Sequence, residues 1–373
     1  MPIKIQHRNE ALRRLVFFVS CLMTVSSVLA KDHIFFRQTS FADTQSLPVI
    51  AVFKKWDVTL GDGDYSQTYN QAEIGWHWKS FEVSLLHRLD FVAQYSNETI
   101  QFIQQTKKSD AVLNTQNYNL DLNVFFARSN GLRFAYKNKA THLGINYHIG
   151  VSLLQALFLI DGKLTGQAVY HSEQDYSFDF SVDYYYSKDY LFSRQINKPS
   201  GYGITTDIRL SKQFSERIEV QLSLIDLFGV IRWENTPRTQ ANADSSKKMF
   251  DDQGRQKFEP VLKGIEKSET FLQTLPRRIS LDVLYQVHPR LKVLFEWFKT
   301  DVRNYFPVGL AFSLNSNVSA TPSPVLKFEH EPFVRFWRLG IETQQLSVSL
   351  LFDKLTPHKI HTAGGTFSIK IPI

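Results

Sequence analysis

Charged side chains that alternate with apolar ones are the feature of this 373-residue chain with the most direct bearing on chemistry. Side chains on a strand point alternately to opposite faces, so each such segment has one polar and one apolar face. A ladder of charges of mixed sign can line a water-filled pore, and it can equally close into salt bridges that fill a narrow barrel. The candidate lumen-lining residues are Glu73, His77, Glu82, Arg88, Asp121, Arg133, Asp179, Asp183, Asp207, Arg209, Arg217, Glu219, Asp282 and Glu296.

Hydrolytic chemistry is the competing interpretation of the polar residues. His171, Ser172 and Glu173 have the side-chain types of a nucleophile with its base. Neighbours on a strand point to opposite faces, however, so His171 and Ser172 would not meet. The chain also has no Gly-x-Ser-x-Gly or His-Glu-x-x-His motif. We therefore predict no enzyme, no catalytic residue and no cofactor, with a lipid-modifying hydrolase as the less favoured alternative.

The elements that would position these charges are strands. Between Tyr176 and Ser187 every second residue is large and apolar, and similar alternation recurs along the chain. The segments have about the length of membrane-crossing strands, ~9–11 residues, and none approaches the ~18 apolar residues of a spanning helix. The pattern predicts an all-β fold, a transmembrane antiparallel β-barrel of about 14 strands with a range of roughly 12–16.

The first thirty residues have the composition of a cleavable signal peptide. A basic stretch with Arg13 and Arg14 precedes an apolar run, and Val28-Leu29-Ala30 offers a cleavage site. We expect residues 31–373 to form a single barrel domain. Cys21, the only cysteine, lies in the leader, which excludes disulfides and cysteine-ligated metal in the mature chain. The formal charge of +7 partly belongs to the leader, and an exported chain favours lipopolysaccharide phosphates over nucleic acid as its anionic partner.

Several segments interrupt the alternation. Ser129-Asn130-Gly131 and Asp161-Gly162 have the composition of tight turns, and 91–116 that of a long polar loop. The longest insertion, 235–275, has apolar residues spaced as on an amphipathic helix. We expect this partly helical insertion to plug the lumen, lie on the membrane or dock a periplasmic partner, unless it is an ordered loop without a role.

One segment, 151–160, is apolar on both faces apart from Ser152 and Gln155. In a barrel, one of these faces must point inward. Its apolar residues could guide a hydrophobic substrate, or they could pack beneath a plug or an inward-folded loop. The second interpretation requires no ligand.

The last strand carries a class-level resemblance. Phe367, Ile369, Ile371 and Ile373 alternate to the final residue, which is similar to the terminal strand that the barrel-assembly machinery recognises in Gram-negative outer-membrane proteins. The chain ends in Ile where that class usually has Phe. The segment 223–233 also resembles part of barrels distantly similar to the FadL and PorP groups. The signal peptide, the repeated alternation and the terminal strand together predict a cell outer-membrane barrel that acts as a passive channel or transporter for small or hydrophobic solutes. The alternative is a structural adaptor that anchors a periplasmic or secretion machinery.

Overall fold

The computed structural model of the chain describes residues 32–52, 59–107, 116–172, 175–191, 194–245, 248–250, 256–258, 261–314 and 323–373. The predicted signal peptide, 1–30, lies outside these residues. The fold is all-β, as the alternation predicts. Among the described helices, none is both long enough and apolar enough to cross a membrane.

The first half of the chain contains two helices among its strands. Its elements are β1 (His33–Thr44), α2 (Val49–Val52), β2 (Tyr65–Trp78), β3 (Phe81–Tyr95), α3 (Asn97–Lys107), β4 (Gln116–Ala140), β5 (Ile145–Ser172), β6 (Asp175–Tyr186) and β7 (Ser200–Gln213).

The second half consists of strands and one short 3-10 helix. These elements are β8 (Ile218–Ile225), β9 (Val230–Asp244), β10 (Lys248–Phe250), β11 (Gln256–Phe258), β12 (Val261–Thr274), β13 (Arg278–His288), β14 (Leu291–Lys299), β15 (Asn304–Tyr305), β16 (Val308–Ser313), β17 (Val325–Glu331), β18 (Phe336–Glu342), β19 (Leu346–Phe352), η1 (Pro357–Lys359) and β20 (Thr362–Pro372).

Eighteen of these strands form one antiparallel sheet that closes on itself, because β1 pairs with both β2 and β20. This number exceeds the predicted 14. Part of the excess comes from successive strands that pair with the same neighbour: β6 and β7 both pair with β5, β8 and β9 both pair with β7, and β15 and β16 both pair with β14.

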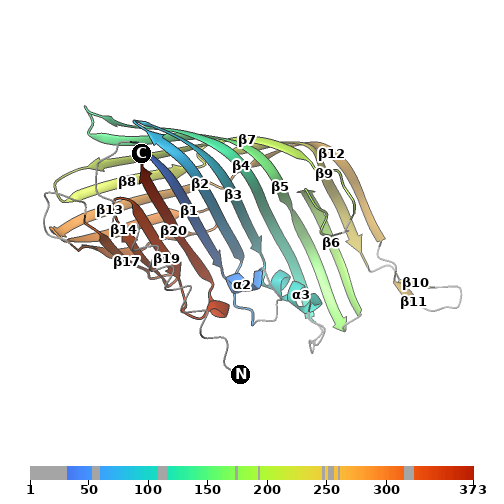
Figure 1. The fold of residues 1–373 in the computed structure, drawn as a ribbon. Coiled ribbons are helices and arrows are strands. Elements are labelled where there is room, and N and C mark those ends of the chain that lie inside the picture. The colour runs from blue at the N-terminus through green and yellow to red at the C-terminus, as the bar shows by residue number, and fades with distance from the viewer. Residues whose placement is uncertain are drawn as a thin grey trace, which may run out of the picture.

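The barrel has two unlike ends (Figure 1). At the turn end, short connections such as Lys79-Ser80 join the strands, and β20 finishes there beside the start of β1. The positive φ of Lys79, 55°, is the left-handed conformation that such a tight connection uses. The opposite, loop end carries α2, α3 and the longer connections. This asymmetry is typical of outer-membrane barrels, whose short turns face the periplasm.

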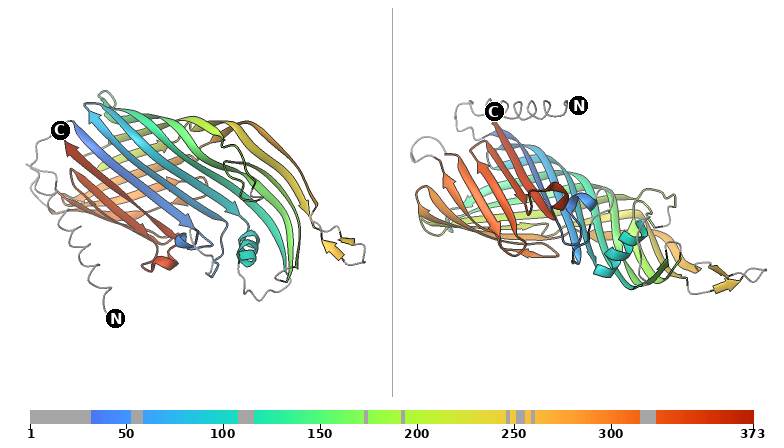
Figure 2. Two further views of the ribbon diagram at one scale, coloured as in Figure 1. Left: turned by 45° about the vertical axis from the view of Figure 1, so that its right-hand side comes forward. Right: turned by 90° about the horizontal axis from the view of Figure 1, so that it is seen from below.

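The wall is much taller on one side than on the other (Figure 2). Strands β4 and β5 have 25 and 28 residues, whereas β17, β18 and β19 have seven each. The long parts of β4, β5, β6, β9 and β12 therefore form a five-stranded extension at the loop end.

Large apolar side chains cover the outer face of the barrel. Ile74, Leu85 and Leu350 are among them, with 54%, 60% and 61% of their surfaces exposed. Near the turn end the outer side chains form a row of neighbouring aromatic rings: Trp76, Trp78, Phe81, Tyr136 and Tyr147. An apolar band that ends in an aromatic girdle matches the environment of a lipid bilayer and its interface.

The outer face of the extension is covered by other parts of the chain. Tyr95 and Ile100 pack with Leu47 beneath α2 and α3, and Phe102 of α3 lies against Tyr118 of β4. The aromatic stripe of β6 is also buried: Val182 and Tyr184 pack with Ile196, which belongs to the segment after β6. By itself this stripe would suggest a lipid-facing strand, but the segment after β6 covers much of it.

The helix predicted within 235–275 is wrong. Most of the segment forms β9 and β12, which pair along their whole length, and β10 pairs with β11 near the tip of the extension (Figures 1 and 2). Cross-strand pairing with β9 satisfies the backbone groups of β12, so tertiary context overrides the helical spacing of its apolar residues. No plug helix occurs among the described residues of this segment.

Two predicted turns are also wrong. Asn130-Gly131 lies inside β4, and Asp161-Gly162 lies inside β5. The glycines are needed for close packing between strands: an added Cβ on Gly162 would lie 2.3 Å from Cβ of Tyr184, and one on Gly131 would lie 2.5 Å from the carbonyl oxygen of Leu153. Glycine here allows close backbone approach within a sheet rather than a change of direction.

Candidate functional site

Charged side chains gather inside the barrel near the turn end. Glu82 accepts a hydrogen bond from Arg37 Nη2 at 2.7 Å, and Arg133 Nη1 lies 3.7 Å from the same carboxylate oxygen. His77 Nδ1 lies 3.4 Å from the other oxygen of Glu82, and Glu73 lies 3.5 Å from Arg37. Four of the candidate residues, from strands β2, β3 and β4, thus meet in one ion-pair cluster.

A second ionic cluster joins opposite walls across the interior. Asp226, between β8 and β9, is fully buried and bonds to Arg88 of β3 at 2.5 Å and 2.8 Å, and to Arg278 of β13 at 2.6 Å. Asp90 bonds to the other side of Arg88, at 2.5 Å, and the Arg278 guanidinium lies 3.4 Å above the Tyr69 ring. Two guanidinium groups and two carboxylates balance in charge, which burial requires.

An apolar cluster continues this contact between the walls. Trp233 of β9 is fully buried and packs with Leu154 and Leu159 of β5, and with Leu86 of β3. Its indole Nε1 donates a hydrogen bond to Gln273 of β12 at 3.0 Å. Inward residues of the apolar segment 151–160 therefore pack with Trp233 of β9, two strands away in the wall.

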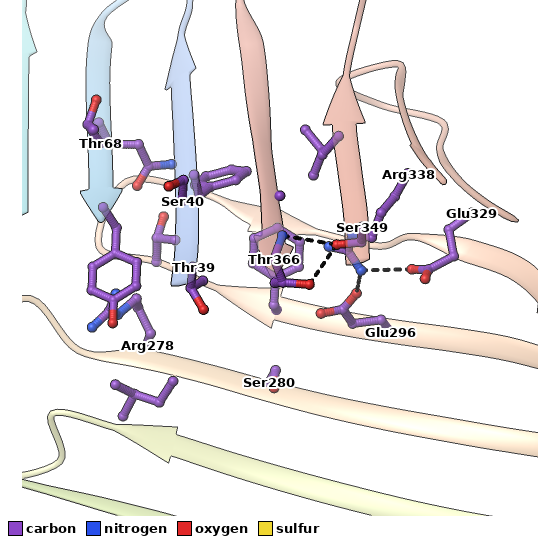
Figure 3. Close-up of a pocket in the computed structure, with 18 of the residues that line it drawn as sticks. Thr39, Ser40, Thr68, Arg278, Ser280, Glu296, Glu329, Arg338, Ser349 and Thr366 are labelled. Carbon is purple, nitrogen blue, oxygen red and sulfur yellow. Dashed lines mark hydrogen bonds and ion pairs between the residues drawn. The ribbon is translucent and has the colours of Figure 1, made fainter. Parts of the chain in front are cut away.

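The other half of the interior holds a cavity of about 400 Å³ between β1, β2, β13, β14 and β17 to β20 (Figure 3). Hydroxyl groups of Thr39, Ser280, Ser349 and Thr366 line its wall. Ser349 Oγ lies 2.8 Å from Thr366 Oγ1. A volume of this size suits one small organic molecule.

Two layers of side chains lie on the loop-end side of the cavity. The first is aromatic: Phe41 lies edge-on to Phe298 at 5.7 Å, and Phe298 stacks on Tyr305 at 4.3 Å between ring centroids. The second is a buried polar network around Asp43, which accepts hydrogen bonds from Tyr65, Tyr305 and Thr362 at 2.6, 2.6 and 2.9 Å. We name Phe41, Asp43, Tyr65, Phe298, Tyr305 and Thr362 the loop-end seal.

The opposite side of the cavity is ionic and reaches solvent. Glu296 and Glu329 both contact Arg338 Nη1, at 2.5 and 2.8 Å. Nearer the turn end, Lys327 pairs with Glu342 at 2.6 Å, and these side chains are 36% and 49% exposed. The cavity thus reaches exposed residues on both sides, Lys327 and Glu342 toward the turn end and Asp301 toward the loop end.

The remaining candidates lie elsewhere. Asp121, Asp179 and Asp183 are on the inward face of the extension, where Arg238 bonds to Asp183. Asp207 pairs with Arg133, and Asp282 accepts a hydrogen bond from Gln221. Arg209 and Glu219 alternate with the apolar residues of β7 and β8. Arg217 is misassigned: it lies exposed in the turn between β7 and β8, one residue before the strand begins.

Asp226, Trp233, Asp43 and Tyr305 were not among the sequence candidates. Asp226 lies at φ 60° between two strands, outside any alternating segment. Asp43 and Tyr305 lie at strand ends, where alternation gives no signal. Among the described residues, no group of three or more His, Cys, Asp or Glu side chains has the geometry of a metal site.

No family model and no curated protein matches the chain. Its structure is similar to a TodX mutant described as a monoaromatic hydrocarbon channel, with 8% identity, TM-score 0.42 and coverage of 93% of this chain and 91% of that one. It is also similar to the monoaromatic hydrocarbon channel CymD, with 8% identity, TM-score 0.40 and coverage of 92% and 89%. A third is a FadL homologue of Pseudomonas aeruginosa, with 8% identity, TM-score 0.23 and coverage of 92% and 90%.

The class of the chain is set by its own strand pairing and side-chain placement: it is a closed antiparallel β-barrel with an apolar outer band and a polar, partly filled interior.

Proposed function

We propose that this protein is an outer-membrane β-barrel that admits small solutes with an apolar body to the periplasm. Two observations support this proposal: the outer face carries an apolar band, and the interior holds a cavity of about 400 Å³ with the loop-end seal on one side. The outer band calls for lipid, because so much exposed apolar surface is unfavourable in water.

The interior favours a gated route over an open pore. The cluster around Asp226 and the packing of Trp233 fill one half of the lumen, and the loop-end seal covers the other half. On this route a solute enters from the loop end beside the seal, reaches the cavity and leaves past Lys327 and Glu342. Hydrocarbon transport in the similar channels TodX and CymD is compatible with this route.

The proposal includes the partners that such a barrel requires. The alternating outward residues of β20, Phe367 and Ile371, form the terminal strand that we expect the barrel-assembly machinery to recognise. Outer-membrane lipid and lipopolysaccharide would surround the apolar band. The role of β10 and β11 as a docking element for another protein stays an alternative proposal.

Location and uptake test this function together. Cells with and without the protein are fractionated, and the uptake of radiolabelled benzyl alcohol by intact cells is measured. We expect a heat-modifiable band in the outer-membrane fraction and faster uptake in cells that contain the protein. Recovery of the mature chain in the periplasmic fraction, or uptake equal to that of the empty-vector cells, would overturn the proposal.

A further inference from the structure

The side chains of the cavity differ sharply between its two sides. Phe41, Phe298 and Leu351 line it on the side of the loop-end seal, and Phe336 belongs to the same buried cluster behind them. Glu296 and Arg338 are each two residues further toward the turn end on the same strands, β14 and β18. Two residues along a strand span about 6–7 Å, which is close to the length of one aromatic ring with a single substituent.

Carboxylates outnumber their cationic partner at the ionic side. Asp282 stands directly opposite Glu296 in the pairing of β13 with β14, and Glu329 stands opposite Arg338 in the pairing of β17 with β18. Gly309 belongs to β16, the strand between β14, which carries Glu296, and β17, which carries Glu329. An added Cβ there would meet Cγ of Glu329 at 2.6 Å, so the absence of a side chain leaves the space that Glu329 occupies.

One guanidinium nitrogen serves both glutamates. Arg338 Nη1 contacts Oε2 of Glu296 and Oε2 of Glu329 (Figure 3). Among the described residues, no hydrogen bond to Oε1 of Glu296 or Glu329 occurs, and both glutamates line the cavity. The cavity therefore offers two carboxylate oxygens that can accept hydrogen bonds from a bound molecule.

We propose that the cavity binds small amphipathic molecules made of one apolar ring and a hydrogen-bond-donating head, a hydroxyl or an ammonium group. The ring lies against Phe41 and Phe298, and the head donates to Glu296 or Glu329. A hydrocarbon of the same size leaves these carboxylates without a partner, and an anionic head meets like charge. This inference rests on the proposed function, because it names the solute class that the same cavity takes.

The test compares four heads on one ring. Binding of benzylamine, benzyl alcohol, toluene and benzoate to the refolded full-length mature protein is measured at pH 7 by equilibrium dialysis, with protein-free micelles as the blank. We expect benzylamine and benzyl alcohol to bind more tightly than toluene, and benzoate the most weakly. Because a hydrogen bond to a charged group is a strong one, the affinities of benzylamine and benzoate should differ by about tenfold or more.

A substitution in the cavity tests whether the preference for a donating head group arises there. Glu329→Gln should reduce the ratio of benzylamine to benzoate affinity several-fold, whereas Glu216→Gln, which removes the same charge from the exposed β7–β8 turn, should leave it unchanged. The head-group series of the wild-type protein stands even if Glu329→Gln does not fold. Benzoate or toluene binding as tightly as benzyl alcohol overturns this inference and leaves the proposed function intact. No binding of any of the four compounds overturns both.

Discussion

Asp226 holds two arginine side chains from different walls of the barrel. Asp226→Asn should lower the free energy of unfolding by at least about 3 kcal/mol, because removing one partner leaves a buried guanidinium without compensation. Asparagine tolerates the left-handed backbone at this position, φ 60°, so the effect reports charge rather than strain. Urea unfolding of the refolded protein, followed by heat-modifiable migration, measures the change.

The matched control for this prediction is Asp62→Asn. Asp62 is exposed in the connection between α2 and β2, and no ion pair to it occurs among the described residues. It should unfold at the same urea concentration as the wild-type protein. Equal stability of both variants would show that the contact across the lumen contributes nothing.

Trp233 makes the apolar counterpart of that contact. It is fully buried among Leu154, Leu159 and Leu86, so Trp233→Ala should destabilise the barrel by about 3–5 kcal/mol. The same unfolding measurement applies, with Trp76→Ala as the control, because Trp76 is half exposed on the outer face. A smaller loss for Trp233→Ala than for Trp76→Ala would contradict direct packing of the two walls.

At the scale of elements, alternation identifies most strands and the face of most of their residues, because a single buried or lipid-covered face imposes a period of two. The inward placement of Glu82, Arg88 and Asp282 follows from it. Alternation cannot tell whether lipid or protein covers the apolar face of a strand. The apolar stripe of β6, which includes Val182, suggests a lipid-facing strand, but the chain itself buries it. It also does not encode pairing, so Asn130-Gly131 suggests a turn inside a strand of 25 residues.

The ion pairs of the site could not be predicted from the sequence either, because alternation gives the face of a residue and not its partner. Which inward charges meet depends on how far the barrel is flattened, and contacts such as Arg88 with Asp226 join residues 138 positions apart. The loop-end seal likewise brings Asp43 and Tyr305 together from positions 262 residues apart.

The seal is the element that borders the proposed route at the loop end. Tyr305→Phe keeps the ring stacked on Phe298 and removes the hydroxyl that bonds to Asp43 and Gln67. Because a buried carboxylate then loses one donor, the closed state should be weakened, and single-channel recordings in planar bilayers should show more frequent openings than the silent wild type. Tyr285→Phe, on the outer face, is the control. Identical recordings from both variants would exclude the seal as the gate.

The whole molecule has one orientation in the membrane if the short turns face the periplasm. The mature chain offers a direct test, because its only cysteine, Cys21, belongs to the predicted leader. Single cysteines are placed at Asp62, exposed at the loop end, and at His142, exposed in the β4–β5 turn. A membrane-impermeant maleimide applied to intact cells should label Asp62→Cys and should label His142→Cys only after the outer membrane is permeabilised. Labelling of His142→Cys alone in intact cells would invert the barrel, and the side of the cavity with Lys327 and Glu342 would then face outward.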